Sequence, residues 1–128
     1  MRRFAIAALA LTLPVVFAAC ENGNNSVEPT TSVSGTYFLR TVNGSPLPYT
    51  FSDGSTLVSD VLTLYSDGTY TDNGQFADGF GSGEQGYYDA LNGSITFAPQ
   101  GSTSYSGSLS GSVLTEIFTG LTEVYQKQ

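Results

Sequence analysis

The chain of 128 residues has no histidine and no tryptophan, and it has a single cysteine. Without histidine, a Ser-His-Asp triad, a Cys-His pair and the usual zinc sites cannot be assembled. One cysteine cannot form a disulfide within the chain, so stability must come from packing and strand pairing. These absences exclude most hydrolases and predict a protein without a metal or other cofactor.

Positive charge is also scarce, with four Lys and Arg residues against eleven Asp and Glu residues. Two of the cations, Arg2 and Arg3, stand at the extreme N-terminus. If that segment is removed, Arg40 and Lys127 face eleven carboxylates, a formal charge of −9. Because such a surface repels phosphate, we expect no nucleic-acid partner.

The N-terminus has the organisation of a secretory signal peptide. Arg2 and Arg3 precede an uncharged, mostly apolar run over residues 4–19 that ends in small residues. The run is shorter than the roughly twenty apolar residues that a membrane-spanning helix needs. We therefore expect residues 1–19 to be a cleaved signal peptide.

The end of this run, Phe17-Ala18-Ala19-Cys20, resembles the lipobox of bacterial lipoproteins. The resemblance implies that Cys20 is lipidated and becomes the first residue of the mature chain, so the membrane becomes a partner through the lipid anchor. We expect the protein in the cell envelope, at the outer membrane facing the periplasm. The alternative is a plain secretory signal cut near Ala19, which leaves a free thiol.

Residues 20–34 are polar, with several asparagine, serine and threonine residues and no hydrophobic period. This composition is typical of a flexible tether. We expect these residues to be a lipidated, disordered linker to a single domain over residues 35–128.

From residue 35 onward, apolar residues alternate with polar ones between turn signals such as Asn43-Gly44, Asp67-Gly68 and Asn92-Gly93. This pattern predicts antiparallel hairpins. Two prolines in residues 45–48 keep that segment out of a central ladder. A glycine-rich flexible loop is expected over residues 77–86, and strands are expected over residues 36–42, 61–65, 69–76, 87–90, 94–98, 103–109, 112–118 and 121–126.

The fold class predicted is all-β: a small antiparallel up-and-down meander of eight or nine strands, closed or nearly closed into a barrel. Closure removes both unpaired edges of the sheet, which favours a barrel over an open sandwich. One register stays open, because Leu114 and Ile117 cannot share a face of their strand without a bulge.

The domain resembles the lipocalin-like lipoproteins of bacteria, part of the calycin-type barrels. The resemblance runs from residue 35 to residue 125. It implies a barrel fold and a ligand-transport function, with Tyr37 where lipocalins proper have tryptophan. It rests on Gly35-Thr36-Tyr37-Phe38-Leu39, Val42-Asn43-Gly44-Ser45-Pro46-Leu47-Pro48, Leu62-Thr63-Leu64, Asp67-Gly68-Thr69-Tyr70, Tyr105 to Gly107 and Leu114-Thr115.

Residues of one parity within each strand should form the inner face of the barrel. This interior is either filled by its own side chains or hollow enough for a small apolar ligand, and a small eight-stranded barrel favours filling. The residues expected to line a ligand cavity, if one exists, are Tyr37, Leu39, Leu62, Leu64, Tyr70, Tyr88, Ile95, Phe97 and Tyr105.

The acidic residues offer two further readings. Glu84 and Asp89 are the best pair for carboxylate-based glycoside hydrolysis, although most acids, such as Asp53, Asp67 and Asp78, precede turn glycines. A calcium loop over residues 72–84 fails the EF-hand spacing, because Asp78 occupies the position of the invariant glycine.

Three functional classes therefore remain. The first is a non-catalytic interaction or structural domain that meets an envelope protein, the second is a binder of a small apolar ligand, and the third is a carbohydrate-active enzyme. A cavity of several hundred cubic ångströms would favour the ligand binder. A packed interior with an exposed apolar patch would favour the interaction domain.

Overall fold

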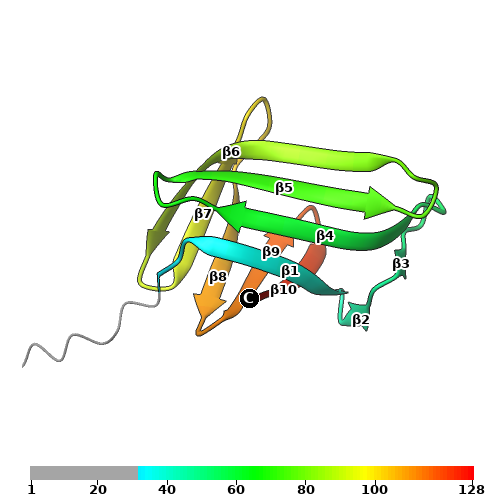
Figure 1. Ribbon diagram of the computed structural model, residues 1–128, viewed down its shortest axis with the longest axis horizontal. Coiled ribbons are helices and arrows are strands. Elements are labelled where there is room, and N and C mark those ends of the chain that lie inside the picture. The colour runs from blue at the N-terminus through cyan, green and yellow to red at the C-terminus, as the bar shows by residue number, and fades with distance from the viewer. Residues whose placement is uncertain (1–31) are drawn as a thin grey trace, which may run out of the picture.

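The structure is a computed structural model that describes residues 32–128, so the predicted signal peptide, Cys20 and most of the predicted tether lie outside the described residues. Residues 32–128 form strands joined by turns and contain no helix (Figure 1), and hence no helix suited to crossing a membrane. The strands are β1 (Gly35–Val42), β2 (Ser45–Pro46), β3 (Tyr49–Thr50), β4 (Thr56–Leu64), β5 (Thr69–Phe76), β6 (Gly81–Leu91), β7 (Ser94–Pro99), β8 (Tyr105–Ser110), β9 (Val113–Phe118) and β10 (Leu121–Lys127).

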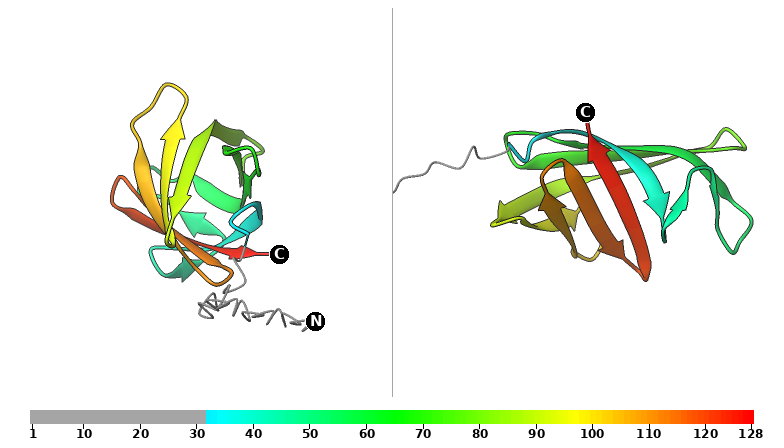
Figure 2. Two further views of the ribbon diagram at one scale, coloured as in Figure 1. Left: turned by 90° about the vertical axis from the view of Figure 1, so that its left-hand side faces the viewer. Right: turned by 90° about the horizontal axis from the view of Figure 1, so that it is seen from below.

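The sheet closes into a barrel. The strand order is β2-β1-β10-β9-β8-β7-β6-β5-β4-β3, and β1 also pairs with β4 over four residues. β1 and β4 to β10 therefore form a closed ring of eight antiparallel strands (Figure 2), while β2 and β3 are two-residue strands on its edge. This confirms the predicted all-β, up-and-down barrel, and the fold is lipocalin-like.

Two predicted turns have the backbone that their residues favour. Asn43 and Asn92 have φ values of 50° and 51°, and Gly44 and Gly93 follow them with φ values of 78° and 79°. Two successive positive φ values are what a tight hairpin turn of the type I′ class requires. The Asn-Gly pairs thereby fix where β1 and β6 reverse.

The prediction of a flexible loop over residues 77–86 is wrong for its second half. β6 begins at Gly81, and Gly81 to Tyr87 pair with Gln75 to Thr69 of β5. Glycine there marks close approach rather than flexibility. A Cβ on Gly86 would lie 2.2 Å from the carbonyl oxygen of Ala98, so the neighbouring strand leaves no space for a side chain.

Two other strands differ from expectation. β4 begins at Thr56 rather than at residue 61. The sequence did not show this earlier start, because a register shift between Leu57 and Ser59 interrupts the alternation of apolar and polar residues. In β9 the open register is settled without a bulge: Leu114 is buried and Ile117 is 60% exposed. The inward position that follows Leu114 is Glu116, a carboxylate inside the barrel.

The barrel has two distinct ends. The entry end, where the chain joins β1, contains the β4–β5, β6–β7 and β8–β9 turns and the C-terminus. The far end contains the β5–β6 and β9–β10 turns and the segment from β2 to the start of β4 (Figure 1). Buried side chains fill the entry end, namely Tyr37, Leu62, Leu64, Tyr70, Ile95, Phe97 and Leu114.

Residues 32–34 already contact the barrel. Val33 packs against the core, and its carbonyl accepts a 2.6 Å hydrogen bond from the Tyr37 hydroxyl. The Lys127 ammonium donates to the carbonyl of Ser32 and lies 5.6 Å from the centre of the Tyr37 ring. The chain therefore enters the barrel at a fixed position.

Candidate functional site

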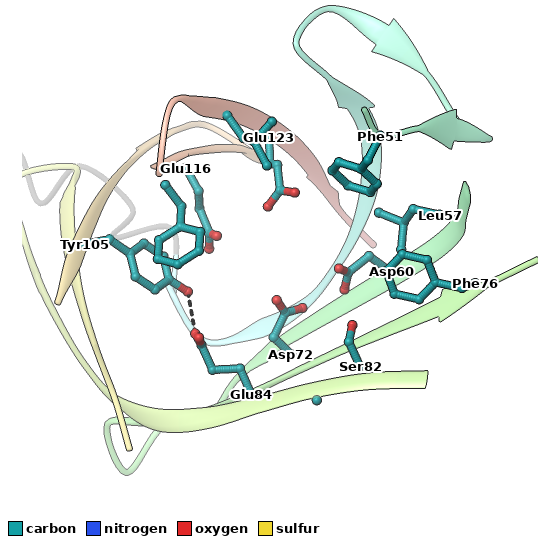
Figure 3. A pocket seen from close by; sticks show the side chains of 13 residues that line it. Phe51, Leu57, Asp60, Asp72, Phe76, Ser82, Glu84, Tyr105, Glu116 and Glu123 are labelled. Carbon is teal, nitrogen blue, oxygen red and sulfur yellow. Dashed lines mark hydrogen bonds between the residues drawn. The ribbon is translucent and has the colours of Figure 1, made fainter. Parts of the chain in front are cut away.

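Five carboxylates from five strands point into the far end of the barrel (Figure 3). Each occupies the inward parity of its strand, as Asp60 does two residues before buried Leu62, and Glu116 does two residues after buried Leu114. We call this group the interior acids, and it consists of Asp60 on β4, Asp72 on β5, Glu84 on β6, Glu116 on β9 and Glu123 on β10.

Strand pairing places these acids against one another. Asp72 is directly opposite Glu84, and Glu116 is directly opposite Glu123. Asp60 pairs with Gly74, which puts it diagonally next to Asp72. Like charges directly opposite on neighbouring strands are destabilising. The arrangement therefore opposes folding stability and indicates another use for these residues.

The interior acids surround a cavity of about 310 Å³. Ser82 and Gly83 are exposed where they line it, so the cavity reaches solvent at the far end. A Cβ on Gly74 would lie 2.5 Å from Ser82 Oγ and 3.4 Å from Asp60 Oδ2, so this glycine leaves the space that those side chains occupy.

Apolar side chains form the rest of the cavity wall, namely Phe51, Leu57, Phe76, Phe118 and Leu121, together with the ring of Tyr105. Phe51 and Phe76 have ring centres 6.4 Å apart, and Tyr105 and Phe118 have ring centres 5.0 Å apart. The cavity is thus amphipathic, with aromatic rings beside carboxylates.

Glu116 is the most deeply buried of the acids, with 2% of its surface exposed. Burial raises its pKa to about 8, and the negative charges of Glu123, Asp60 and Glu84 contribute to the rise. Burial also raises the pKa of Glu123, with a further contribution from the charge of Asp60. Charge on this side of the cavity is therefore costly while the cavity is empty.

Asp60 and Asp72 act as a pair. Burial raises the pKa of both, and their side chains interact so that Asp72 keeps the proton that the two share. Two adjacent buried carboxyls cannot both ionise cheaply.

Glu84 is held in place by two phenols. The hydroxyls of Tyr70 and Tyr105 both donate to Glu84 Oε1, at 2.7 Å and 2.9 Å. Burial raises the pKa of both tyrosines, so they remain protonated donors. Glu84 is therefore a fixed acceptor on the wall of the cavity (Figure 3).

Three buried oxygens of the interior acids have no hydrogen-bond partner among residues 32–128: Asp60 Oδ1, Asp72 Oδ1 and Glu116 Oε1. The two cations within residues 32–128 lie elsewhere, with Arg40 exposed on β1 and Lys127 above Tyr37. Within the same residues, no three acidic side chains are placed to hold one metal ion. Buried polar atoms without partners are uncommon and costly.

Sequence reasoning gave no role to Asp60, Glu116 and Glu123 and did not place Asp72 and Glu84 in one interior group, because it assigned acidic residues mainly to turns. That assignment is correct for Asp53, Asp67 and Asp78, whose carboxylates accept backbone N–H bonds of 2.9 to 3.0 Å from the residue two positions later. Hydrogen bonds from Ser55 and Thr69 lower the pKa of Asp53 and Asp67. The signal that distinguishes the interior acids from these turn residues is their position in a strand, an even number of residues from a buried apolar residue.

The predicted catalytic pair of Glu84 and Asp89 is not brought together. The two residues differ by an odd number, so Glu84 faces the cavity while Asp89 is exposed on the outer face of β6. The acids of the considered calcium loop over residues 72–84 do not lie together either. Asp72 and Glu84 face inward from β5 and β6, whereas Asp78 caps the β5–β6 turn.

The nine residues predicted to line a ligand cavity all lie in the barrel core or pack against it. Seven are buried, and Tyr88 and Tyr105 are partly buried. Tyr105 is the member of this set that lines the cavity at the far end. The Tyr88 hydroxyl instead donates to the carbonyl of Tyr65 at 2.7 Å.

A solved structure of a lipocalin-like protein from Bacteroides uniformis is similar to this chain, with 16% sequence identity and a TM-score of 0.49 over 74% of this chain and 97% of that one. No family model and no curated protein matches the chain. The lipocalin-like character of the fold rests on the strand order and on the closing β1–β4 pairing.

Proposed function

We propose that this chain is a lipid-anchored lipoprotein of the cell envelope whose barrel binds a small ligand in the cavity at its far end. The observation that carries the proposal is the 310 Å³ cavity, which reaches solvent and is lined by both aromatic and carboxylate side chains. Its volume is at the lower end of the range of about 300–1,000 Å³ that is usual for small-molecule sites.

The anchor follows from the sequence features around Cys20. The chain enters the barrel at the end opposite the cavity. A lipid on Cys20 would therefore attach the barrel through the end that lacks the cavity, so the tether would not cover the cavity mouth. That attachment suits a protein that exchanges its ligand with the aqueous space of the envelope.

The sequence ranked an interaction domain first among the functional classes, but the geometry of the barrel favours it less than a ligand-binding domain. Its expected mark is one contiguous apolar patch on a packed barrel. The large apolar side chains on the outer face are instead spread over strands that are not neighbours, with Tyr87 and Leu91 on β6 and Ile117 on β9.

Lipidation is tested by metabolic labelling with a fatty-acid analogue. We expect the wild-type chain to be labelled and the Cys20→Ser variant to lose the label and move to the soluble fraction. Labelling that persists in Cys20→Ser would contradict the anchor, whatever the cavity binds.

Ligand binding is tested by native mass spectrometry of the protein purified from its own membrane. We expect a small-molecule adduct on the wild type that is lost in Ser82→Trp, which places a large ring in the cavity mouth. The matched control is Thr96→Trp, at an exposed outward position of β7, which should keep the adduct. A wild type without an adduct, or an adduct that Ser82→Trp retains, would contradict the proposal.

A further inference from the structure

The polar part of the cavity wall consists almost entirely of carboxyl groups, which, once they are ionised, only accept hydrogen bonds. The interior acids supply five carboxyl groups, and the remaining polar side chains are the hydroxyls of Ser82 and Tyr105. The Tyr105 hydroxyl already donates to Glu84. No basic side chain lines this cavity. A ligand that stabilises the ionised form of these carboxyls must therefore donate hydrogen bonds and carry positive charge.

Glu116 gives a second and independent indication. It is 98% buried, its Oε1 has no hydrogen-bond partner in the part of the chain that the structure describes, and Figure 3 shows its carboxyl directed into the cavity. Across the strand ladders it meets Gly107, which has no side chain, on one side and the like carboxyl of Glu123 on the other, and neither donates to Glu116 Oε1. A buried carboxylate in this state costs stability unless a partner arrives from outside the chain.

The geometry favours an organic cation over a metal ion. A metal ion needs several oxygens within about 2.6 Å of one point, whereas residues 32–128 present no such group of acids. The apolar wall would also gain nothing from a hydrated metal. Aromatic rings such as Phe118 and Tyr105 attract an ammonium group and pack against the hydrocarbon part of an amine.

We propose that the far-end cavity binds a small organic amine in its ammonium form, with Glu116, Glu123 and Asp60 around the ammonium and with Phe51, Phe76 and Phe118 around the apolar body. This inference rests on the proposed function and names the chemical class of its ligand. It replaces the apolar ligand expected from the sequence with an amphipathic cation.

Binding is coupled to loss of a proton. The charged and titratable groups that face Glu116 are Glu123 and Tyr125 from β10, Asp60 from β4, Asp72 and Tyr70 from β5, Glu84 from β6 and Tyr105 from β8, and all are acids. The pKa of Glu116 is about 8, and an adjacent ammonium would lower it. Amine affinity should therefore rise as the pH increases from about 6 to about 8, and fall again near about pH 10, where an alkyl ammonium loses its own proton.

The experiment uses the full-length chain in a nonionic detergent, with isothermal titration calorimetry at about pH 8. The probe is 2-phenylethylamine, and its matched controls are neutral 2-phenylethanol and anionic phenylacetate, which keep the aromatic body and change only the charge. We expect the amine to bind about tenfold or more tightly than the alcohol, the difference that one charge-assisted hydrogen bond provides, and phenylacetate not to bind. Titrations of the amine in two buffers of different ionisation enthalpy should show proton release at about pH 7.

The variant Glu116→Gln keeps the shape of the side chain and removes its charge. We expect it to reduce amine affinity about tenfold or more and to leave alcohol affinity unchanged. The control variant is Asp89→Asn, a carboxylate on the outer face of β6, which should change neither.

Equal binding of the amine and the alcohol would overturn the cationic ligand while leaving a ligand-binding barrel intact. Amine binding that Glu116→Gln does not weaken would also overturn it, as would displacement of the amine by equimolar calcium chloride. If no probe binds, the inference fails for this class of ligand, and the adduct measurement on the native protein decides separately whether the barrel binds any ligand.

Discussion

The entry end and the far end of the barrel are made from the same eight strands and the same alternation, but they bury opposite kinds of side chain. At the entry end the inward positions are apolar, as with Leu62, Leu64 and Phe97, and they are fully packed. At the far end, five of the eight strands, namely β4, β5, β6, β9 and β10, place a carboxylate at an inward position around a cavity. One end therefore supplies the stability of the fold, and the other uses part of that stability to hold a site.

Aromatic packing shows how the entry end supports the far end. Phe97 stacks on Tyr105 with ring centres 5.0 Å apart and meets Tyr70 edge to face at 5.1 Å. The hydroxyls of these two tyrosines reach Glu84. The packed core thus fixes the position of one wall of the cavity through rigid side chains.

The largest expected effect is at the entry end. Leu64→Ala removes a fully buried side chain and should lower the free energy of unfolding by about 2–5 kcal/mol, whereas Thr63→Ala on the opposite face should change it by about 0.5 kcal/mol. Denaturant titration of both variants measures the difference. A larger loss from Thr63→Ala would mean that the inner face of β4 is assigned to the wrong parity.

The next largest expected effect is at the far end, where a substitution should raise the free energy of unfolding rather than lower it. The folded-state pKa of Glu116 is raised from 4.5 to about 8, so the folded protein holds a proton that the unfolded chain releases between these values. The contribution of Glu116 to stability therefore falls as the pH rises from about 4.5 through about 8, and this contribution is constant above that value. Glu116→Gln removes this loss and should stabilise the protein by about 1–3 kcal/mol at pH 9 and much less at pH 5.

Chemical denaturation of the wild type and Glu116→Gln at the two pH values checks this prediction. Asp89→Asn provides the control for a carboxylate on the outer face. A Glu116→Gln variant that is less stable than the wild type at pH 9 would mean that the charge of Glu116 supports the fold rather than opposing it.

The smallest expected effect compares the loss of stability when an apolar side chain is removed from the far end and from the entry end. Phe118 is partly exposed and contacts Tyr105 on one side and the cavity on the other. Phe118→Ala should therefore cost about 1 kcal/mol, less than Leu64→Ala in spite of the larger ring removed, because less apolar surface returns to water. Thermal unfolding of the two variants under one set of conditions tests the order.

The entry end was largely predictable from the sequence. Alternation placed Tyr37, Leu39, Ile95 and Phe97 on the inner face, and Asn-Gly pairs marked two of the reversals. These signals are local, since both parity and turn chemistry can be determined within a few residues. The structure of the far end depends instead on the pairing of strands that are distant in the sequence.

The misses at the far end have physical causes. A glycine-rich segment such as residues 81–86 has no side-chain period, so its place in the sheet is determined by pairing with β5. An acid at an inward position looks like a surface residue until barrel closure defines the interior, as for Glu116 and Asp60. Their assignment required the register of strands that are distant in the sequence.

The most direct test of the central claim, that the far end holds unpartnered acids for a cationic ligand, is an NMR titration of the Glu116 side-chain carboxyl carbon with and without 2-phenylethylamine. Assignment follows from the loss of one signal in Glu116→Gln. We predict a pKa of about 8 in the free protein, and a shift toward lower pH when the amine is present. A pKa near 4.5 in the free protein, or a raised pKa that the amine leaves unchanged, would contradict the account.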